Sequence, residues 1–321
     1  MDLYSPETAI HDEAFCKPAE FFITVADELG DMAPVYAILS AFLYALSNVI
    51  TKKGFQYASP IYAAVISLLS CFAASLILCL FVFSPEYFLN NAILFFLAAG
   101  AIGPFLGRLF LYASIDRVGP SIASTLFESK PLFSVLLAVM VLGESLSPAI
   151  ITGLTMMMAG TVIISFEREG GEISKKWTRK DLFVPLLAGL CYGGSHVLRK
   201  PGITAIPVPI VAVMFQNASA LALAPLLSVF SKKQPPAISN RKAAWAIFIF
   251  AGILQVGAQW SLFAALKYGT VVVVSPLTSL STLFVLILAA FFLREVERIT
   301  WKIVAGAILI ISATVVLTAF S

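Results

Sequence analysis

Long apolar runs separated by short polar stretches make up almost the whole chain after its first 32 residues. Each run is close to the ~20 residues that a helix needs to cross the hydrocarbon core of a bilayer. None alternates polar and apolar residues as the strands of a membrane barrel do, so each is expected to satisfy its backbone as a helix. The pattern predicts an all-α integral membrane protein with ten transmembrane helices, at residues 34–51, 60–83, 92–115, 120–142, 147–166, 182–198, 207–230, 244–266, 270–293 and 301–320.

The first and sixth of these spans share one frame of residues. They read FLYALSNVITKKG at 42–54 and LCYGGSHVLRKPG at 190–202, so that Tyr44 matches Tyr192 and Lys52 matches Lys200 at a constant offset. Five helices in each copy is an odd number, so the second copy must be inverted in the membrane relative to the first. Inverted repeats of this kind are typical of transporters, with the substrate site near the midplane between the halves.

The repeats divide the chain into four parts. We expect an acidic, disordered tail at 1–32, a first five-helix repeat at 33–166, a charged linker at 167–181 and a second repeat at 182–321. The tail holds eight acidic residues against Lys17 as its single basic one, and it has no signal-peptide pattern. Met32 stands directly before the first span, so it is a second candidate for the translation start.

Composition supports a membrane protein and excludes several other classes. Hydrophobic residues make up 60% of the chain and charged residues 12%, against about 25% charged residues in soluble domains. Two histidines and four scattered cysteines give no zinc spacing and no disulfide framework, so no metal and no cofactor is expected. Phosphate-binding glycine loops and basic–aromatic patches are absent, so neither ATP-driven transport nor nucleic-acid binding is expected.

The chain resembles the EamA-like family of the drug/metabolite transporter superfamily over nearly all of its length after the tail. The resemblance is carried by Lys52 and Gly54 at the end of the first span, by the run KPLFSVLLAVMVLGES at 130–145, and by Gly153 and Gly160 on one face of the fifth span. It implies ten helices in two inverted repeats, a central cavity and the transport of small organic solutes.

Three charged residues fall inside the predicted spans and are the first candidates for substrate or proton binding: Arg108, Glu128 and Lys130. Arg108 and Glu128 both lie about 10–12 Å deep from one membrane face, so they could form a pair, whereas Lys130 is two residues further on and is expected to point elsewhere. Pro131 interrupts the helix beside them and is a candidate helix break or gate. The alternative is a structural ion pair that only joins two helices.

The second repeat has uncharged residues at the matching places. Its candidates for an amide-lined wall with one aromatic side chain are Gln216, Asn217, Gln255, Gln259 and Trp260. An amphipathic or zwitterionic solute would suit a cavity with one charged and one amide wall. The alternative is that these amides bond neighbouring helices to one another.

Four further residues, from both repeats, are candidates. Tyr44 and Tyr192 lie near cavity height and are substrate-binding candidates, and Pro276 is the second candidate helix break. His196 lies near its predicted helix end. A histidine at such a position is more often solvated than a proton sensor.

The charged residues at the span ends have simpler explanations. Lys52 and Lys200 are expected to extend to lipid headgroups. Glu144 and Glu295 stand at loop starts, where helix capping is enough to explain them.

Basic residues collect on one side of the predicted membrane topology. Loops after odd-numbered spans hold clusters such as Lys52–Lys53, Lys175–Lys176 and Lys232–Lys233, while the other side holds few. The positive-inside rule then places both termini outside, whereas the family resemblance implies cytoplasmic termini. We favour the orientation given by the charges.

The sequence thus predicts a secondary-active transporter, with export as the expected direction, for small organic metabolites or amphipathic solutes. It would work in the cell membrane as a monomer or homodimer by alternating access between the repeats, with membrane lipid around it and protons as a second ligand. Glu128 is the residue that would exchange protons. We do not expect an enzyme. A membrane-embedded transferase and a non-transporting structural subunit remain as the alternatives.

Overall fold

The computed structural model of the chain describes residues 32–58, 60–82, 84–118, 123, 126–168, 178–226, 241–292 and 301–319. These residues form α2 (Met32–Gly54), α3 (Pro60–Leu80), α4 (Pro85–Leu89), α5 (Ile93–Gly100), η1 (Ala101–Gly107), α6 (Arg108–Val118), α8 (Lys130–Leu137), η2 (Ala138–Leu142), α9 (Pro148–Arg168), η3 (Arg179–Leu182), α10 (Phe183–Ala205), α11 (Pro209–Leu223), α13 (Arg241–Tyr268), α14 (Val271–Leu277), α15 (Leu280–Phe292) and α16 (Trp301–Ala319). The acidic tail, the middle of the charged linker and Glu295 lie outside the described residues.

Within the described part of the chain, seven helical segments are long and apolar enough to cross a membrane. Three shorter apolar segments, at 130–142, 148–164 and 209–223, have between 10 and 17 residues. The structure is therefore that of a multi-pass, all-helical membrane protein, as the hydrophobic pattern predicts. The count of ten crossings stays a prediction.

Proline marks where several helices begin. α3, α4, α9 and α11 start at Pro60, Pro85, Pro148 and Pro209. The first residues of a helix have no acceptor for their backbone N–H, so a proline there loses no hydrogen bond and its fixed φ suits the helix. These prolines place the helix starts where the sequence pattern put the span boundaries.

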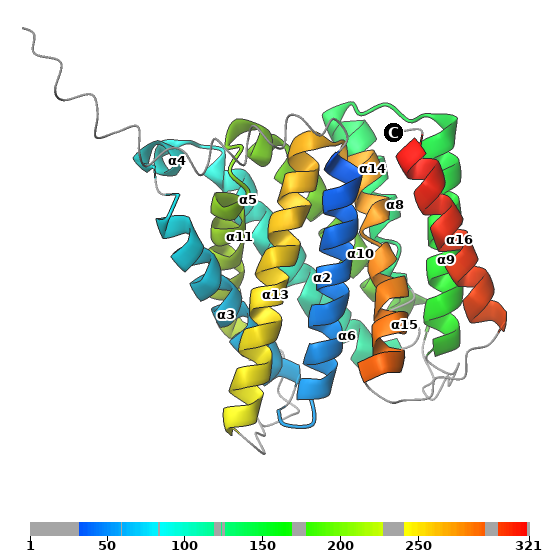
Figure 1. Cartoon of the computed structure of the whole chain (residues 1–321), viewed down its shortest axis with the longest axis horizontal. Coiled ribbons are helices and arrows are strands. Elements are labelled where there is room, and N and C mark those ends of the chain that lie inside the picture. The colour runs from blue at the N-terminus through cyan, green and yellow to red at the C-terminus, as the bar shows by residue number, and fades with distance from the viewer. Residues whose placement is uncertain are drawn as a thin grey trace, which may run out of the picture. The chain divides into compact units, whose positions relative to one another are not determined.

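Helices far apart in the sequence pack side by side and antiparallel. Ser40 and Ser47 on α2 donate hydrogen bonds to the carbonyls of Ala258 and Ala251 on α13, so residue numbers rise along one helix as they fall along the other. Figure 1 shows α2 and α13 lying next to each other, with the α14–α15 pair beyond α2. Phe42 of α2 contacts the ring of Phe284 on α15 edge-on, at 5.5 Å between centroids.

α9 and α16 form a closely packed antiparallel pair at one edge of the helices (Figure 1). A Cβ added to Gly160 would lie 2.6 Å from the carbonyl oxygen of Gly306, and one added to Gly153 would lie 2.6 Å from Cγ of Leu317. Since only glycine leaves room for such close approaches, these positions explain how the two helices pack.

α10 lies at the centre of the fold and contacts η1, α5, α6, α8 and α13. Ser195 on α10 donates a hydrogen bond to the carbonyl of Ala99, which tethers it to α5. α10 is longer than the predicted span, which ended at residue 198: the helix continues through Pro201 to Ala205. Arg199 and Lys200 are therefore inside the helix and not in a loop.

Candidate functional site

A cavity of about 390 Å³ lies between helices drawn from both halves of the chain. Its lining comprises Tyr44, Asn48, Thr51, Phe55, Ala63, Ala64, Ser67, Pro104, Arg108, Leu111, Phe127, Lys130, Tyr192, His196, Arg199, Gln255, Gln259, Leu262, Thr278 and Ser281. This volume is within the ~300–1,000 Å³ usual for small-molecule sites.

The lining of the cavity runs from exposed residues at one end of the helices to buried residues at the other. Phe55, just after α2, is 43% exposed and forms part of the mouth. At the inner end, Arg199 and Leu262 are only 2% and 1% exposed. Beyond them the fully buried rings of Phe96 and Phe263 meet edge-on at 5.6 Å between centroids and fill the space.

Three cationic side chains line the cavity: Arg108 at the start of α6, Lys130 at the start of α8, and Arg199 on α10. Arg108 follows the π-helical segment η1, which contains Pro104. A proline and a widened turn locally break the regular hydrogen bonding of a membrane helix, and here they lie directly before a charged residue.

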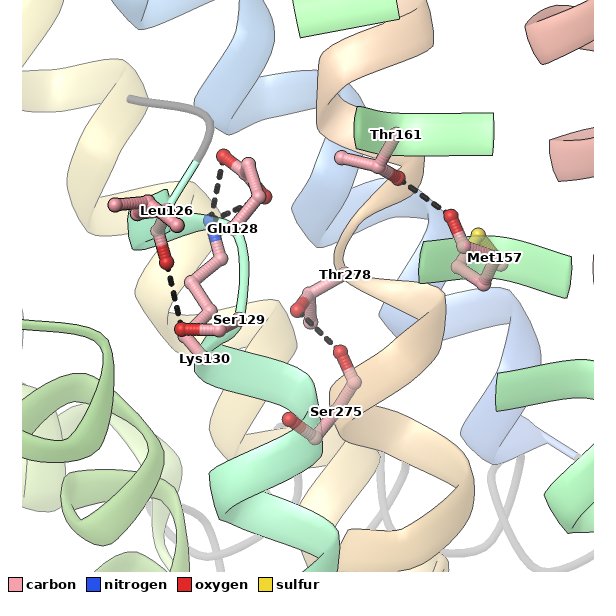
Figure 2. A network of polar contacts seen from close by, with 8 residues as sticks. All are labelled: Leu126, Glu128, Ser129, Lys130, Met157, Thr161, Ser275 and Thr278. Atoms are coloured by element: carbon pink, nitrogen blue, oxygen red, sulfur yellow. Dashed lines mark hydrogen bonds and ion pairs between the residues drawn. The ribbon is translucent and has the colours of Figure 1, made fainter. Parts of the chain in front are cut away.

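Glu128 forms an ion pair with Lys130, a partner that was not expected from the sequence. The Lys130 Nζ lies 3.2 Å from each Glu128 carboxylate oxygen, as Figure 2 shows. The expectation that Lys130 points away from Glu128 is wrong, because it assumed an unbroken helix. Glu128 and Ser129 form a turn before α8 begins, and this turn brings the two side chains together. The Arg108–Glu128 pair stays a prediction.

The Lys130 ammonium also lies 4.8 Å from the centroid of the Phe127 ring. That ring contacts Tyr192 edge-on at 5.0 Å. Tyr192 is one of the two predicted tyrosines, and both it and Tyr44 line the cavity. Phe127, Lys130 and Tyr192 therefore form one continuous patch of the wall, charged at one point and aromatic around it.

Helix breaks occur beside the cavity at both predicted prolines. Pro131 is in the first turn of α8, directly after the turn at 128–129. Pro276 lies in α14, and a turn at Thr278 and Ser279 separates that helix from α15. α8 contacts α14, and Figure 2 shows the two interrupted helices near one another, with Thr278 donating a hydrogen bond to the Ser275 carbonyl.

The predicted amide wall is only partly at the cavity. Gln255 and Gln259 on α13 line it, but the lining does not include Gln216, Asn217 or Trp260. Gln216 and Asn217 are fully buried on α11, behind the wall. Trp260 instead contacts the ring of Tyr36 edge-on at 5.8 Å between centroids.

Arg199 is a cavity residue that the sequence reasoning missed. Its Nε donates a 2.7 Å hydrogen bond to Gln216 Oε1, and its guanidinium lies 5.5 Å from the centroid of the Phe263 ring. His196, three residues earlier on the same helix, is also buried and lines the cavity, so the expectation of a solvated histidine is wrong. The apolar residues after Pro201, among them the buried Ile203 and Ile206, are the sequence signal that α10 continues.

Lys200 closes the inner end of the fold from behind the cavity. Its Nζ donates 2.7 Å hydrogen bonds to the carbonyls of Leu266 and Gly269, at the end of α13. The expectation that it extends to lipid headgroups is therefore wrong. Unpaired carbonyls at a helix end attract a cation strongly, which explains this position.

Glu144 caps the N-terminus of α14, the helix that follows α13. Its two carboxylate oxygens accept 2.9 Å hydrogen bonds from the backbone N–H groups of Val271 and Val272, the first residues of α14. The predicted capping role of Glu144 is confirmed. Together Lys200 and Glu144 hold both sides of the short connection between α13 and α14.

The residues that the structure describes include no cluster of three or more His, Cys, Asp or Glu side chains that could hold a metal ion. The chemistry available at the cavity is that of cations, tyrosines and amides. It suits reversible binding of a polar solute.

Apolar helices that surround a cavity with charged and polar side chains in its lining are typical of membrane transporters. The model of the EamA-like transporter family matches residues 31–166 and 179–319, so this chain belongs to that family.

Among its relatives, a protein of Archaeoglobus fulgidus described as an uncharacterized transporter is 29% identical over 222 residues, which cover 66% of this chain and 71% of that protein. An uncharacterized transporter of Clostridium kluyveri is 28% identical over 144 residues, 44% of this chain and 46% of its own length. A solved crystal structure with 18% sequence identity shares the fold with a TM-score of 0.74, over 89% of this chain and 96% of that one.

Proposed function

We propose that this protein is a secondary-active exporter of small organic metabolites or amphipathic solutes, and that it works by alternating access between two inverted five-helix repeats at 33–166 and 182–321. The observation that carries the proposal is the cavity itself: its lining includes three cations, two tyrosines and two glutamines, it is enclosed by helices from both segments that match the family, and it is exposed at the end where Phe55 lies. A carrier in one of its two end states has this form.

The packing of α9 against α16 supports the inverted repeat. These are the last helices of the two proposed repeats, and they lie antiparallel with Gly160 against Gly306. An inverted repeat requires matching helices to run in opposite directions. Two matching helices that pack antiparallel also bring small residues of both repeats, here Gly160 and Gly306, to the same contact.

The position of the mouth supports export. Thr51 and Phe55 at the mouth lie at the end of α2, beside Lys52 and Lys53. The basic residues therefore lie at the same end as the mouth, and the positive-inside rule assigns that end to the cytoplasm. A cavity open to the cytoplasm is the state in which an exporter in the cell membrane would load its solute.

The cavity is complete within one chain, which supports a monomer as the transporting unit. The buried polar groups at its inner end and the Glu128–Lys130 pair support solute binding over a purely structural role. A polar group that leaves water and gains too few hydrogen bonds costs free energy, and a bound solute would supply the missing partners.

Counterflow in liposomes tests the proposal. The reconstituted protein, preloaded with a mixture of unlabelled amino acids, sugars, organic acids and amines, should accumulate at least one labelled member faster than protein-free liposomes do. Ala64→Trp, which fills the cavity wall, should abolish this, while Ile77→Trp on the exposed face of the same helix should not. Equal rates for the two variants would show that the cavity is not the transport route, and no solute moved by the wild type would contradict a transporter and favour a structural subunit.

A further inference from the structure

The cavity carries an excess of positive charge. Of its lining residues, three are cations and none is an aspartate or glutamate. Glu128, the acid next to the cavity, is in an ion pair with Lys130, and the excess remains when it is counted. Arg199 is buried and has no acidic partner among the residues that the structure describes, and a buried charge needs a counter-charge, so this end of the cavity suits an anion.

Arg199 is the cation that lies deepest. It is 2% exposed, lines the cavity and cannot give up its proton at any ordinary pH. The hydrogen bond from Nε to Gln216 and the contact with Phe263 hold the plane of the guanidinium in place. Its Nη1, also buried, has no hydrogen-bond partner within the part of the chain that the structure describes.

The groups around Arg199 also have unused hydrogen-bonding capacity. In the described residues, His196 Nδ1, Gln216 Nε2 and Gln259 Oε1 are buried without a partner. Buried polar atoms are nearly always bonded, so the unbonded atoms of Arg199, His196 and Gln259, which all line the cavity, indicate a site that a ligand completes. A planar guanidinium held by its Nε is suited to an oxyanion, whose oxygens accept from its remaining N–H groups.

Toward the mouth, apolar side chains line the cavity beside the polar Asn48, Thr51 and Ser67. Ala63, Ala64, Leu111 and Phe55 contribute there. A solute with an anionic group at the inner end would therefore place an uncharged, apolar part toward the mouth.

We propose that the transported solute is an organic oxyanion, a carboxylate or a phosphate ester with a short apolar part, and that Arg199 binds its anionic group. This rests on the proposed transport function and adds the charge of the solute and the residue that recognises it. Gln216 acts as a positioning residue, since it holds Arg199 and does not line the cavity.

A matched series of ligands tests the charge. Hexanoate, hexanamide, hexylamine and hexyl phosphate share one chain and differ in the head group. Dissociation constants come from the rise in the thermal unfolding midpoint of the purified protein with ligand concentration. We expect hexanoate or hexyl phosphate, but neither hexanamide nor hexylamine, to stabilise the wild type, and the stronger of the two anions identifies the head group.

Variants of Arg199 test the residue. Arg199→Gln should weaken binding of the anion by about 10- to 100-fold, the value of a hydrogen bond to a charged group. Arg199→Lys should restore part of the loss, because it keeps the charge but not the planar fork. Lys267→Gln removes a cation from the same end that does not line the cavity, and it should bind as the wild type does.

The inference is overturned if the wild type binds neither hexanoate nor hexyl phosphate better than hexanamide, a result that does not depend on whether any variant folds. It is also overturned if Arg199→Gln keeps the preference for the anion. In either case, counterflow of a neutral or cationic solute in liposomes would leave the transport function standing. If no solute of any charge moves in that assay, the transport function itself fails.

Discussion

Replacing Lys200 with methionine tests how the inner end of the cavity is kept closed. Methionine retains most of the side-chain volume but removes both 2.7 Å hydrogen bonds, to the carbonyls of Leu266 and Gly269. Each hydrogen bond to a charged group is worth about 1.5–3 kcal/mol, and a cation at a helix C-terminus adds ~0.3–1 kcal/mol. Because both bonds depend on one half-buried ammonium, they do not add fully, and we expect a loss of about 2–4 kcal/mol in local stability.

Hydrogen exchange of the backbone amides at the connection between α13 and α14 measures this loss directly. The N–H groups of Gly269 and Val274 are bonded to the carbonyls of Ala265 and Thr270 and report opening at this end. A loss of 2–4 kcal/mol corresponds to roughly 30- to 1,000-fold faster exchange through local opening, at ~1.4 kcal/mol for each factor of ten.

Lys267→Met is the matched control for this variant. Lys267 is at the same end of α13, and its ammonium lies 4.9 Å from the centroid of the Tyr268 ring without bonding the helix-end carbonyls. It should leave exchange within about fivefold of the wild type, because an exposed cation–π contact is worth only ~0.5–1 kcal/mol. Exchange in Lys200→Met equal to that in Lys267→Met would refute the role of Lys200.

Three further outcomes are expected. Gly160→Ala should lower the thermal unfolding midpoint, because its Cβ would lie 2.6 Å from the Gly306 carbonyl oxygen and overpacking costs about 1–3 kcal/mol. As the control, Gly194→Ala should be neutral or slightly stabilising, because the nearest neighbour of its Cβ is 3.7 Å away. Glu128→Gln should leave the protein folded but abolish any acceleration of transport by a pH gradient, and an unchanged pH dependence would exclude Glu128 as the proton site. Gln216→Leu removes the acceptor of the buried Arg199 Nε, so it should cost about 1.5–3 kcal/mol of stability; an unchanged denaturation midpoint would show that Arg199 finds another partner.

The hydrophobic pattern predicted the helices well because apolar run length is what a bilayer selects. It failed at the end of α10, where Arg199, Lys200 and Pro201 together look like the end of a span. The helix continues to Ala205 because Arg199 finds Gln216 and Lys200 finds the carbonyls of α13. Both partners are distant in sequence, so no local pattern could predict them.

The error at Lys130 has a different cause. Spacing along an ideal helix put the side chains of Glu128 and Lys130 on different faces. In the structure Glu128 and Ser129 form a turn, which brings the side chains of Glu128 and Lys130 into contact. Pro131 was recognised as a helix break, but the position of the break upstream of it depends on packing against α10, where Gly189 leaves room for Ser129 and the Phe127 carbonyl.

The two matching lysines differ in their surroundings in a way that follows from the proposed mechanism. Lys200, at the closed inner end, is half-buried and holds the end of α13, whereas Lys52, at the end with the mouth, is exposed. Two positions that are equivalent in sequence thus have different environments within one structure. If the repeats exchange conformations during transport, as inverted repeats can, then Lys52 should become buried when Lys200 is released. In the proposed mechanism the duplicated lysine would provide each end with the same means of closing, and the asymmetry of one structure is what two alternating gates would require.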